Sequence, residues 1–555
     1  MNENENYKII SNEYADLLVE YNGNLNDFQR NDLSYNLIDD KYAVVFIPAN
    51  EMNEQSVLTF GYSSIPKCYG LMTIKANEDG SFILHQLPSL NLTGKDVLIG
   101  IVDTGIVYTM PIFQYPDKTS KIISIWDQSI NEEGRYPEGF YYGTEYHQEQ
   151  INEALSSSNP LSIVPSTDTI GEGTAMAGIA AAFYDKQQKF AGESIDAELV
   201  IVKLKPAKPN LKEFFGIPDE AVCYQENDII MGVQYLLEAA NRLNRPIVIC
   251  TGTGSSQGSH TGNEIINKYL YRIGELTGKA VVVPAGNEGN QNHHYYGEIT
   301  ALTYSSLIEL NIGPQDENFT MELWAYPSDF LIIDVFAPSG EQIDQIDVSY
   351  IESGSFEINY ASAKIDVDYV LSEPYSKYQL FLFRFKNIQS GLWKFQVSTK
   401  NQLSGYFHAW LPIRNFISQE TYFNDANAET TICQPGNGLG VITVTSYNSF
   451  ERIPDPSASR GFNLLNMPKP DISAYGINIL AHSLNTSIIP FSGTSIAAAH
   501  TAGVAAQYLE WGIIKGYLPD INGIMIKYMM ADSANRTVGG TYPNADWGFG
   551  LIYGD

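Results

Sequence analysis

The sequence predicts an α/β protein whose parallel sheet carries helices on both faces, with an α+β unit before it and an antiparallel β domain inserted into it. Between residues 96 and 300, runs of β-branched residues alternate with helical stretches, which is the pattern of a parallel sheet. From about 300 to 430, short strands rich in aromatic residues replace that pattern. The first pattern resumes at residues 441–447. The expected segments are 1–90, 91–300, 301–430 and 431–555.

The first 90 residues precede the first buried strand and form a unit of their own. Residues 14–21 predict a helix, and residues 41–48 predict a strand. Together they indicate a small α+β fold. A separate binding module would give the same pattern.

Two strands of the α/β segment end in polar residues that can take part in chemistry. Residues 96–105, DVLIGIVDTG, run into Asp103, and residues 280–289, AVVVPAGNEG, carry Asn287 into a glycine-lined turn. The carboxyl ends of parallel strands meet at one edge of a sheet. We therefore expect Asp103 and Asn287 to share a surface, where the Asn287 amide can donate to an oxyanion.

A serine follows at the start of a small-residue helix. Residues 491–507 read FSGTSIAAAHTAGVAAQ, and Ser495 falls in the first helical turn. Unpaired backbone N–H groups and the helix dipole favour a developing negative charge there, so this is a suitable place for a nucleophile. An isolated SGTS string is more simply a helix cap. A second glycine-opened helix, GEGTAMAGIAAA at 171–182, supports the catalytic interpretation.

The inserted segment is read as an antiparallel sandwich. Its aromatic strands are FTMELWAY, FLIIDVFAP, YQLFLFRF, GLWKFQVS and GYFHAWLP. Their spacing with turn residues between them is typical of such a fold. We predict that the aromatic side chains of these strands form the core of the sandwich. A ligand-binding groove is the alternative.

The composition limits the possible partners. The 555 residues carry 64 acidic and 33 basic side chains, a net charge of −31. Nucleic acid and anionic membranes are therefore disfavoured, because either needs a basic face. The sequence predicts neither a signal peptide nor a transmembrane helix. Four scattered cysteines without CxxC spacing indicate free thiols rather than disulfides or a zinc site: Cys68, Cys223, Cys250 and Cys433. We expect no cofactor and no metal.

Asp103, the helix at 171–182, Asn287 and Ser495, taken in chain order, resemble the subtilisin-like serine proteases, whose triad follows the order Asp, His, Ser. Further strings strengthen the resemblance: IVICTGTGSSQGSHTG at 247–262 and KPDISAYG at 469–476. Others bring it closest to the Csp group, germination proteases of spore-forming clostridia: SSIPKCYGLM at 63–72, the GSHTG loop and YPNADWGFG at 542–550. The resemblance implies a subtilisin-like fold with an N-terminal prodomain at 1–90 and a jelly-roll insertion.

One position departs from the family pattern. Where the family has G-H-G-T-H, this chain has Gly171, Glu172, Gly173, Thr174 and Ala175. Glu172 thus stands in place of the catalytic histidine, and none of the eight histidines offers a replacement on sequence grounds. A carboxylate, with a reference pKa of about 4.3 against about 6.5 for imidazole, is the weaker base, and once ionised it has no proton for a leaving amine. Beside Asp103, one carboxyl of the pair is expected to have a raised pKa.

The resemblance therefore implies a pseudoprotease in which Asp103, Glu172, Ser495 and the oxyanion residue Asn287 form a degenerate site. The enzymatic alternative is an active serine endopeptidase, possibly of the serine-carboxyl (sedolisin) type, which uses Glu as its base. That type has an Asp four residues after the Glu, and an Asp at the oxyanion position. This chain has Met176 and Asn287 there, and both departures disfavour the alternative.

A chain without a working base is expected to keep its prodomain uncleaved, with the tail of the prodomain across Ser495. Function would then reside in binding within the germination pathway of the spore. The expected partners are the chain's own prodomain and a Csp-family protease or a protein of the cortex-hydrolase pathway, with a small-molecule germinant as a further candidate. Both the CspA-like and the CspC-like branches remain open, with a slight preference for CspC-like because the chain carries its own prodomain.

Overall fold

The computed structural model describes residues 5–25, 28, 33–75, 91–184, 190–348, 351–400 and 404–552. Its centre is a nine-stranded sheet in the order β26-β25-β13-β11-β6-β9-β7-β8, with β27 also paired to β25. The strands are β6 (Leu98–Asp103), β7 (Ile122–Asp127), β8 (Thr144–His147), β9 (Glu198–Lys203), β11 (Ile247–Thr251), β13 (Lys279–Pro284), β25 (Ile442–Asn448), β26 (Ile453–Pro454) and β27 (Ile472–Tyr475). All neighbours pair in parallel except the short edge strands β8 and β26.

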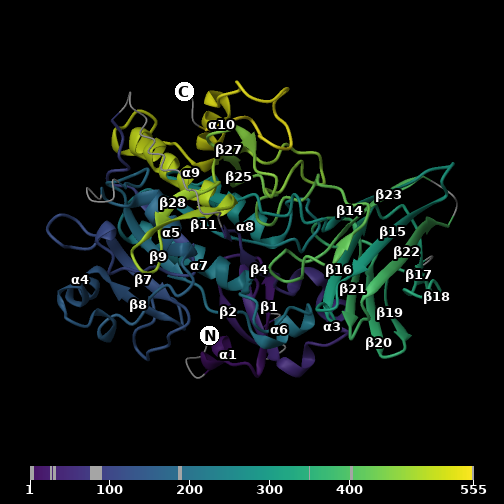
Figure 1. The fold of residues 1–555 in the computed structure, drawn as a ribbon. Coiled ribbons are helices and arrows are strands. Elements are labelled where there is room, and N and C mark those ends of the chain that lie inside the picture. The colour runs from purple at the N-terminus through teal and green to yellow at the C-terminus, as the bar shows by residue number, and fades with distance from the viewer. Residues whose placement is uncertain are drawn as a thin grey trace.

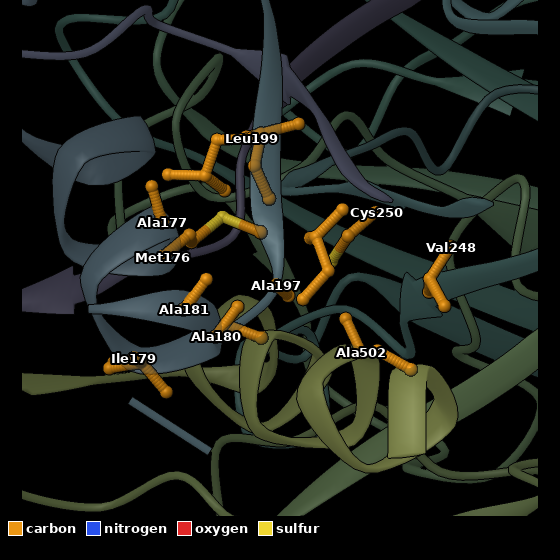
Figure 2. Packing of buried hydrophobic residues seen from close by; sticks show 14 of the residues in the cluster. Met176, Ala177, Ile179, Ala180, Ala181, Ala197, Leu199, Val248, Cys250 and Ala502 are labelled. Atoms are coloured by element: carbon orange, nitrogen blue, oxygen red, sulfur yellow. The ribbon is translucent and has the colours of Figure 1, made fainter. Parts of the chain in front are cut away.

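Helices cover both faces of this sheet (Figure 1). Helices α5 (Glu172–Ala181) and α9 (Thr494–Leu509) lie on one face, and α7 (Glu226–Arg242) and α8 (Ile265–Gly274) on the other. Side chains of β6 alternate accordingly, because Ile99 and Ile101 belong to the first core and Leu98 and Val102 to the second. Figure 2 shows Ala177 of α5 near Leu199 of β9 and Ala502 of α9 near Val248 of β11, all in the first core. Within the described ranges, no helix is both long and apolar enough to cross a membrane.

The N-terminal region folds around a three-stranded antiparallel sheet, β1-β3-β2. Its elements are α1 (Tyr7–Ile10), β1 (Tyr14–Glu20), β2 (Ser34–Leu37), β3 (Tyr42–Pro48) and α3 (Ser56–Phe60). The strand expected at 41–48 is present, but the helix expected at 14–21 is wrong, because these residues form β1. Both faces of β1 are buried, with Leu17 in one core and Leu18 in another. The adjacent apolar residues of β1 do not alternate, so their spacing resembles that of a helix. The strand forms because β1 pairs with β3 along its whole length.

The inserted segment forms two antiparallel sheets. One has six strands in the order β14-β23-β16-β21-β20-β19, and the other has five in the order β18-β17-β22-β15-β24. Their bounds are β14 (His294–Ile299), β15 (Ser305–Ile312), β16 (Phe319–Ala325), β17 (Leu331–Phe336), β18 (Gln342–Asp347), β19 (Ser353–Tyr360), β20 (Ala363–Val370), β21 (Gln379–Lys386), β22 (Gly391–Thr399), β23 (Gly405–Trp410) and β24 (Tyr422–Phe423). A single buried cluster contains side chains of both sheets, so the two sheets form a sandwich.

Buried polar contacts fasten the N-terminal region to both other parts of the chain. The Lys208 ammonium, next to helix α6 (Pro209–Phe214), lies 2.6 Å from Asp16 on β1, and both side chains are at most 3% exposed. The Tyr62 hydroxyl donates to Glu322 on β16 at 2.6 Å, and the other oxygen of Glu322 accepts the N–H of Gly258. The carboxylate of Glu322 thereby joins all three parts of the molecule.

The buried ion pair between Asp16 and Lys208 gives a first prediction. Asp16→Asn leaves the Lys208 ammonium buried without its counter-ion, so the free energy of unfolding should fall by about 3–5 kcal/mol. The matched control is Asp40→Asn, because Asp40 is 78% exposed in its pair with Arg272 and should contribute less than about 1 kcal/mol. Urea unfolding measures both values, and amide hydrogen exchange shows whether the loss falls on β1 and β3. Equal effects of the two substitutions would contradict the prediction.

Candidate active site

The structure brings all four predicted site residues to one end of the central sheet. Asp103 ends β6, and Asn287 follows β13 by three residues. Glu172 is the first residue of α5, and Ser495 is the second residue of α9. All four are buried, with exposed fractions of 0–2%. The parallel sheet, in which β6, β11 and β13 are neighbours, explains how residues from distant parts of the chain meet.

Asp103 and Glu172 form a pair of buried carboxyl groups. Asp103 accepts the N–H of Thr104 on one oxygen, whereas its other oxygen and both oxygens of Glu172 lack a well-aligned hydrogen bond among the described residues. The two groups converge at Gly252, where a Cβ would lie 2.3 Å from Asp103 Oδ2 and 2.9 Å from Glu172 Oε1. Gly252 thus leaves room for the pair, which the sequence did not reveal.

Burial raises both pKa values. Desolvation raises the pKa of Asp103 to about 7, against a smaller lowering by the N–H of Thr104. Desolvation, and then the negative charge of Asp103, raise the pKa of Glu172 well above its ordinary value, and the nearby hydroxyls of Ser495 and Thr73 lower it by less. Both causes favour the neutral, protonated form of Glu172, in agreement with the physical expectation for two close carboxyls in a dry site.

Asn287 holds a backbone carbonyl oxygen. Its Nδ2 donates to the oxygen of Met72 at 2.6 Å, and the N–H of Ser495 points at the same oxygen from 3.5 Å. The amide is oriented because its Oδ1 accepts the N–H and the hydroxyl of Thr494, each at 3.2 Å. Two donors converging on one carbonyl oxygen have the layout of an oxyanion hole.

The occupant is the chain's own residues 68–75, which pass through the site as an extended strand. Strand β4 (Cys68–Leu71) lies between β10 (Tyr224–Gln225) and β12 (Thr253–Gly254). Beyond the site, β5 (Ile74–Lys75) pairs with β29 (Ile488–Ser492). Backbone pairing on both sides thus holds this occluding segment, as we call residues 68–75.

Between these two strands, the occluding segment contacts the nucleophile position directly. The N–H of Met72 donates to the oxygen of Gly252 at 3.0 Å, and the Thr73 hydroxyl lies 2.8 Å from the Ser495 hydroxyl. Gly493, with φ of 125°, is required here, because a Cβ would lie 2.3 Å from the Met72 oxygen. Met72 and Thr73 were not recognised as site residues from the sequence, since contacts with distant segments leave no local pattern. Residues 76–90, which include the expected end of the prodomain, lie outside the described residues.

The histidines that the structure describes make their contacts elsewhere. His500, five residues after Ser495, has its Nδ1 2.7 Å from Glu193. His260 lies between the backbone oxygens of Ser256 and Ile432. The remaining contacts are His147 with Glu145, His293 with Glu288, His294 with His408, and His482 with Phe190. His85 lies outside the described residues.

Among the described residues, no group of three or more His, Cys, Asp and Glu side chains is arranged to hold a metal ion. The four cysteines are buried free thiols. What the site does offer is a serine hydroxyl, two donors for a carbonyl oxygen, and a carboxyl group where proton transfer would be needed.

The fold and this site define a subtilase, and comparison with known proteins agrees. The subtilase family model (Peptidase_S8) matches residues 94–308 and 415–550, more than half of the chain, so the chain belongs to this family. The unmatched stretch between them contains most of the sandwich. This finding confirms the predicted family and fold class.

Among solved structures, the Clostridium perfringens CspB protease resembles this chain with a TM-score of 0.75 and 29% sequence identity, over 83% of this chain and 92% of that one. This likeness confirms the predicted resemblance to the Csp group. Fervidolysin from Fervidobacterium pennivorans, a keratinolytic enzyme related to subtilisin, matches with a TM-score of 0.48 and 14% identity, over 97% of this chain and 60% of its own. A search of curated proteins returned no significant match.

The carboxyl pair gives a prediction for stability against pH. A carboxyl whose pKa rises on folding stabilises the fold below its unfolded pKa, and this contribution is lost as the pH rises through the folded value. For Asp103, the rise from 3.8 to about 7 corresponds to at most about 4 kcal/mol, lost between those pH values. Asp103→Asn should therefore unfold with a weaker pH dependence than the wild type, measured with urea at pH 4.5 and pH 8.

The exposed Asp40→Asn substitution serves as its control and should keep the wild-type dependence. If Asp103→Asn and the wild type lost the same stability between the two pH values, Asp103 would not be titrating as described.

Proposed function

We propose that this subtilase is catalytically inactive, keeps its N-terminal region uncut across the active site, and acts by binding. The observation that carries the proposal is the carboxyl group of Glu172 beside Ser495, at the position where the family has its histidine. Acyl transfer needs a group that takes the serine proton and then gives it to the leaving amine. A neutral Glu172 carboxyl cannot accept that proton, and an ionised one has no proton to give to the leaving amine.

The expected loss of activity is large. Removal of the triad histidine alone from a subtilisin lowers kcat on the order of 10⁶. The oxyanion position is intact here, but stabilisation of an oxyanion does not replace the missing base. We therefore assign Asn287 and Ser495 the role of holding the occluding segment.

The occluding segment supports the second part of the proposal. It has the register of a bound substrate, with the Met72 carbonyl between Asn287 and Ser495 and the chain continuing through Thr73 into β5. In a working subtilase this placement would present the bond between Met72 and Thr73 for cleavage. Without a base the bond stays whole, and residues 1–90 remain a retained prodomain that closes the cleft.

The likeness to the Csp group favours a role in spore germination. We propose that the chain is associated with the spore, binds a Csp-family protease or a protein of the cortex-hydrolase pathway, and regulates germination through that contact. A small-molecule germinant is a further candidate ligand, and the sandwich at 301–430 offers an additional surface for a partner. Both the CspA-like and CspC-like roles fit this proposal.

An active serine-carboxyl endopeptidase is the second candidate, favoured by the Glu172 carboxyl facing Ser495. The residue one helical turn after Glu172 argues against it. Met176 is fully buried, and its sulfur lies 2.6 Å from the position of a Cβ on Gly252, beside the carboxyl pair. A thioether cannot relay a proton, so the carboxyl pair lacks the additional acid of that enzyme type.

Labelling with a fluorophosphonate tests the absence of a base. The wild type should not react at pH 7.5 or at pH 4, because the Ser495 hydroxyl keeps its proton and is covered by Thr73. An active subtilisin is the positive control, and Ser495→Ala is the negative one. Labelling at Ser495 at either pH would overturn the proposal, and labelling in acid alone would favour the serine-carboxyl candidate. Glu172→His by itself should restore little, since the occluding segment and Ala175 remain.

The intact mass tests retention of the N-terminal region. The recombinant chain should keep its full mass of 61.7 kDa, without a cut between Met72 and Thr73. Mass spectrometry of the purified protein measures this directly. Efficient processing in a clean host that disappears in Ser495→Ala would show self-cleavage and refute the proposal.

In the organism, Ser495→Ala should leave spore germination nearly unchanged, because the serine serves binding of the occluding segment rather than catalysis. Charge reversals on the exposed face of the sandwich, chosen to keep the melting temperature, should impair germination instead. A folded and abundant Ser495→Ala protein that blocked germination would show that the chain acts as a protease.

A further inference from the structure

A short connection within the sandwich reaches out over the occluding segment. We call it the strap, residues 411–417, which follow β23 and precede β24. Its two ends, Leu411 and Ile417, lie in the core of the sandwich. Ile413 and Phe416 lie between them and belong instead to the buried cluster that contains residues of the occluding segment. The strap therefore leaves the sandwich core, reaches the cleft and returns.

Hydrogen bonds hold the strap against the cleft. The backbone N–H of Arg414 donates to the carboxylate of Glu288 at 3.0 Å, and Glu288 is the residue after the oxyanion residue Asn287. The side-chain amide of Asn415 donates to the backbone oxygen of Leu71, in the occluding segment, at 2.8 Å. The strap is thus tied both to the α/β unit and to the segment that it covers.

Side chains of the occluding segment alternate between two cores, as expected for a strand. Tyr69 and Leu71 pack against the core on the α7 and α8 face of the central sheet. Cys68 and Met72 lie in the other cluster, together with the strap. Gly70 lies between Cys68 and Met72 in this alternation, so its missing side chain would point at the strap.

The strap leaves no room for a side chain at position 70. A Cβ on Gly70 would lie 2.6 Å from Cδ1 of Ile413, and 3.2 and 3.3 Å from two ring atoms of Phe416. A Cβ on Gly254, the residue paired with Gly70, would lie 2.8 Å from Cε of Met72. Other side chains therefore fill the space above this pair of glycines. A methyl group at position 70 requires a shift of Ile413, and a branched side chain does not fit.

Glycine at this position also fixes the register of the strand. Residues 68–75 read CYGLMTIK, with Gly70 as their single glycine. A shift by one residue would exchange the two faces of the strand. A shift by two residues would keep the faces but bring Cys68 or Met72 beneath the strap. Only the observed register therefore combines an empty position at the strap with the Met72 oxygen at Asn287.

We propose that Ile413 and Phe416 determine the specificity of this cleft, which accepts an extended segment only when glycine lies two residues before the residue whose carbonyl Asn287 binds. The chain's own occluding segment meets this requirement. A segment of a partner can replace it only if it carries glycine at the same position. The inference deepens the proposed function, on which the idea of a binding cleft rests. Labelling of Ser495 would overturn that function and leave the requirement for glycine standing.

Volume-matched substitutions test the contact between strap and segment. Gly70→Val places a branched side chain beneath the strap and should speed amide hydrogen exchange of residues 68–75 at least about tenfold. Ile413→Ala removes as many carbon atoms as valine adds, so Gly70→Val/Ile413→Ala should exchange within about threefold of Ile413→Ala alone. If Gly70→Val does not fold, the smaller pair Gly70→Ala and Gly70→Ala/Ile413→Val decides, because it exchanges one methyl group for another.

The matched control is Gly354→Val, since Gly354 is a half-buried glycine within strand β19 of the sandwich. It should change the exchange of residues 68–75 less than about twofold, because local opening of the sandwich edge is separate from the cleft. The proposal would be overturned if this control acted as Gly70→Val does. It would also be overturned if the substitution of Ile413 failed to slow the exchange of the Gly70 variant.

Peptides added to the full-length chain test the specificity itself. The probe is a fluorescein-labelled peptide with the sequence of residues 67–75, with serine in place of cysteine, and the matched peptide has valine in place of glycine. The Gly70→Val protein, whose own segment is displaced, should bind the glycine peptide at least about tenfold more tightly in fluorescence anisotropy. Gly354→Val should bind neither peptide, because its own segment fills the cleft. Equal affinities, or a preference for the valine peptide, would show that the strap does not select glycine.

Discussion

The carbonyl oxygen of Met72, held between the amide of Asn287 and the N–H of Ser495, is the contact on which the arrangement of the site depends. It fixes the register of the occluding segment, because β4 on one side and β5 on the other must pair with fixed strands of the α/β unit. It also requires Gly493, since any side chain there would meet that oxygen. A backbone contact of this kind tolerates changes of the Met72 side chain but not a shift by one residue.

The occluding segment and the carboxyl pair stabilise each other. Two close carboxyls in a dry site are tolerated when protons neutralise them, and burial is the main cause that raises the pKa values of both Asp103 and Glu172. Thr73 lies against Ser495 next to Glu172 and helps to exclude water from this point. A neutral Glu172 in turn leaves the serine hydroxyl free to bind the Thr73 hydroxyl. The proposed inactivity and the proposed retention of the N-terminal region would thus both follow from one desolvated contact.

The sequence predicts those parts of the fold whose hydrophobic pattern is periodic, or whose strands end in a distinctive polar residue. The ends of β6 and β13 are marked by a β-branched run followed by Asp103 or Asn287, and the geometry of parallel sheets then brings those ends together. The error at 14–21 arose because β1 is buried on both faces, so its apolar residues do not alternate. Met72, Thr73 and Gly252 could not be found from the sequence, because they act through contacts with residues far away in the chain.

The presence of Asp103 and Ser495 does not by itself indicate catalysis, because each has a structural task in this fold. Asp103 accepts the N–H of Thr104 at 2.7 Å and so fixes the turn after β6. The Ser495 hydroxyl contacts the Thr73 hydroxyl, and the neighbouring Thr494 orients the Asn287 amide. Each residue therefore makes a local contact in a site with almost no solvent, and that contact is independent of any reaction. The proposed loss of the base is therefore compatible with the presence of two members of the triad, since their local contacts require no turnover.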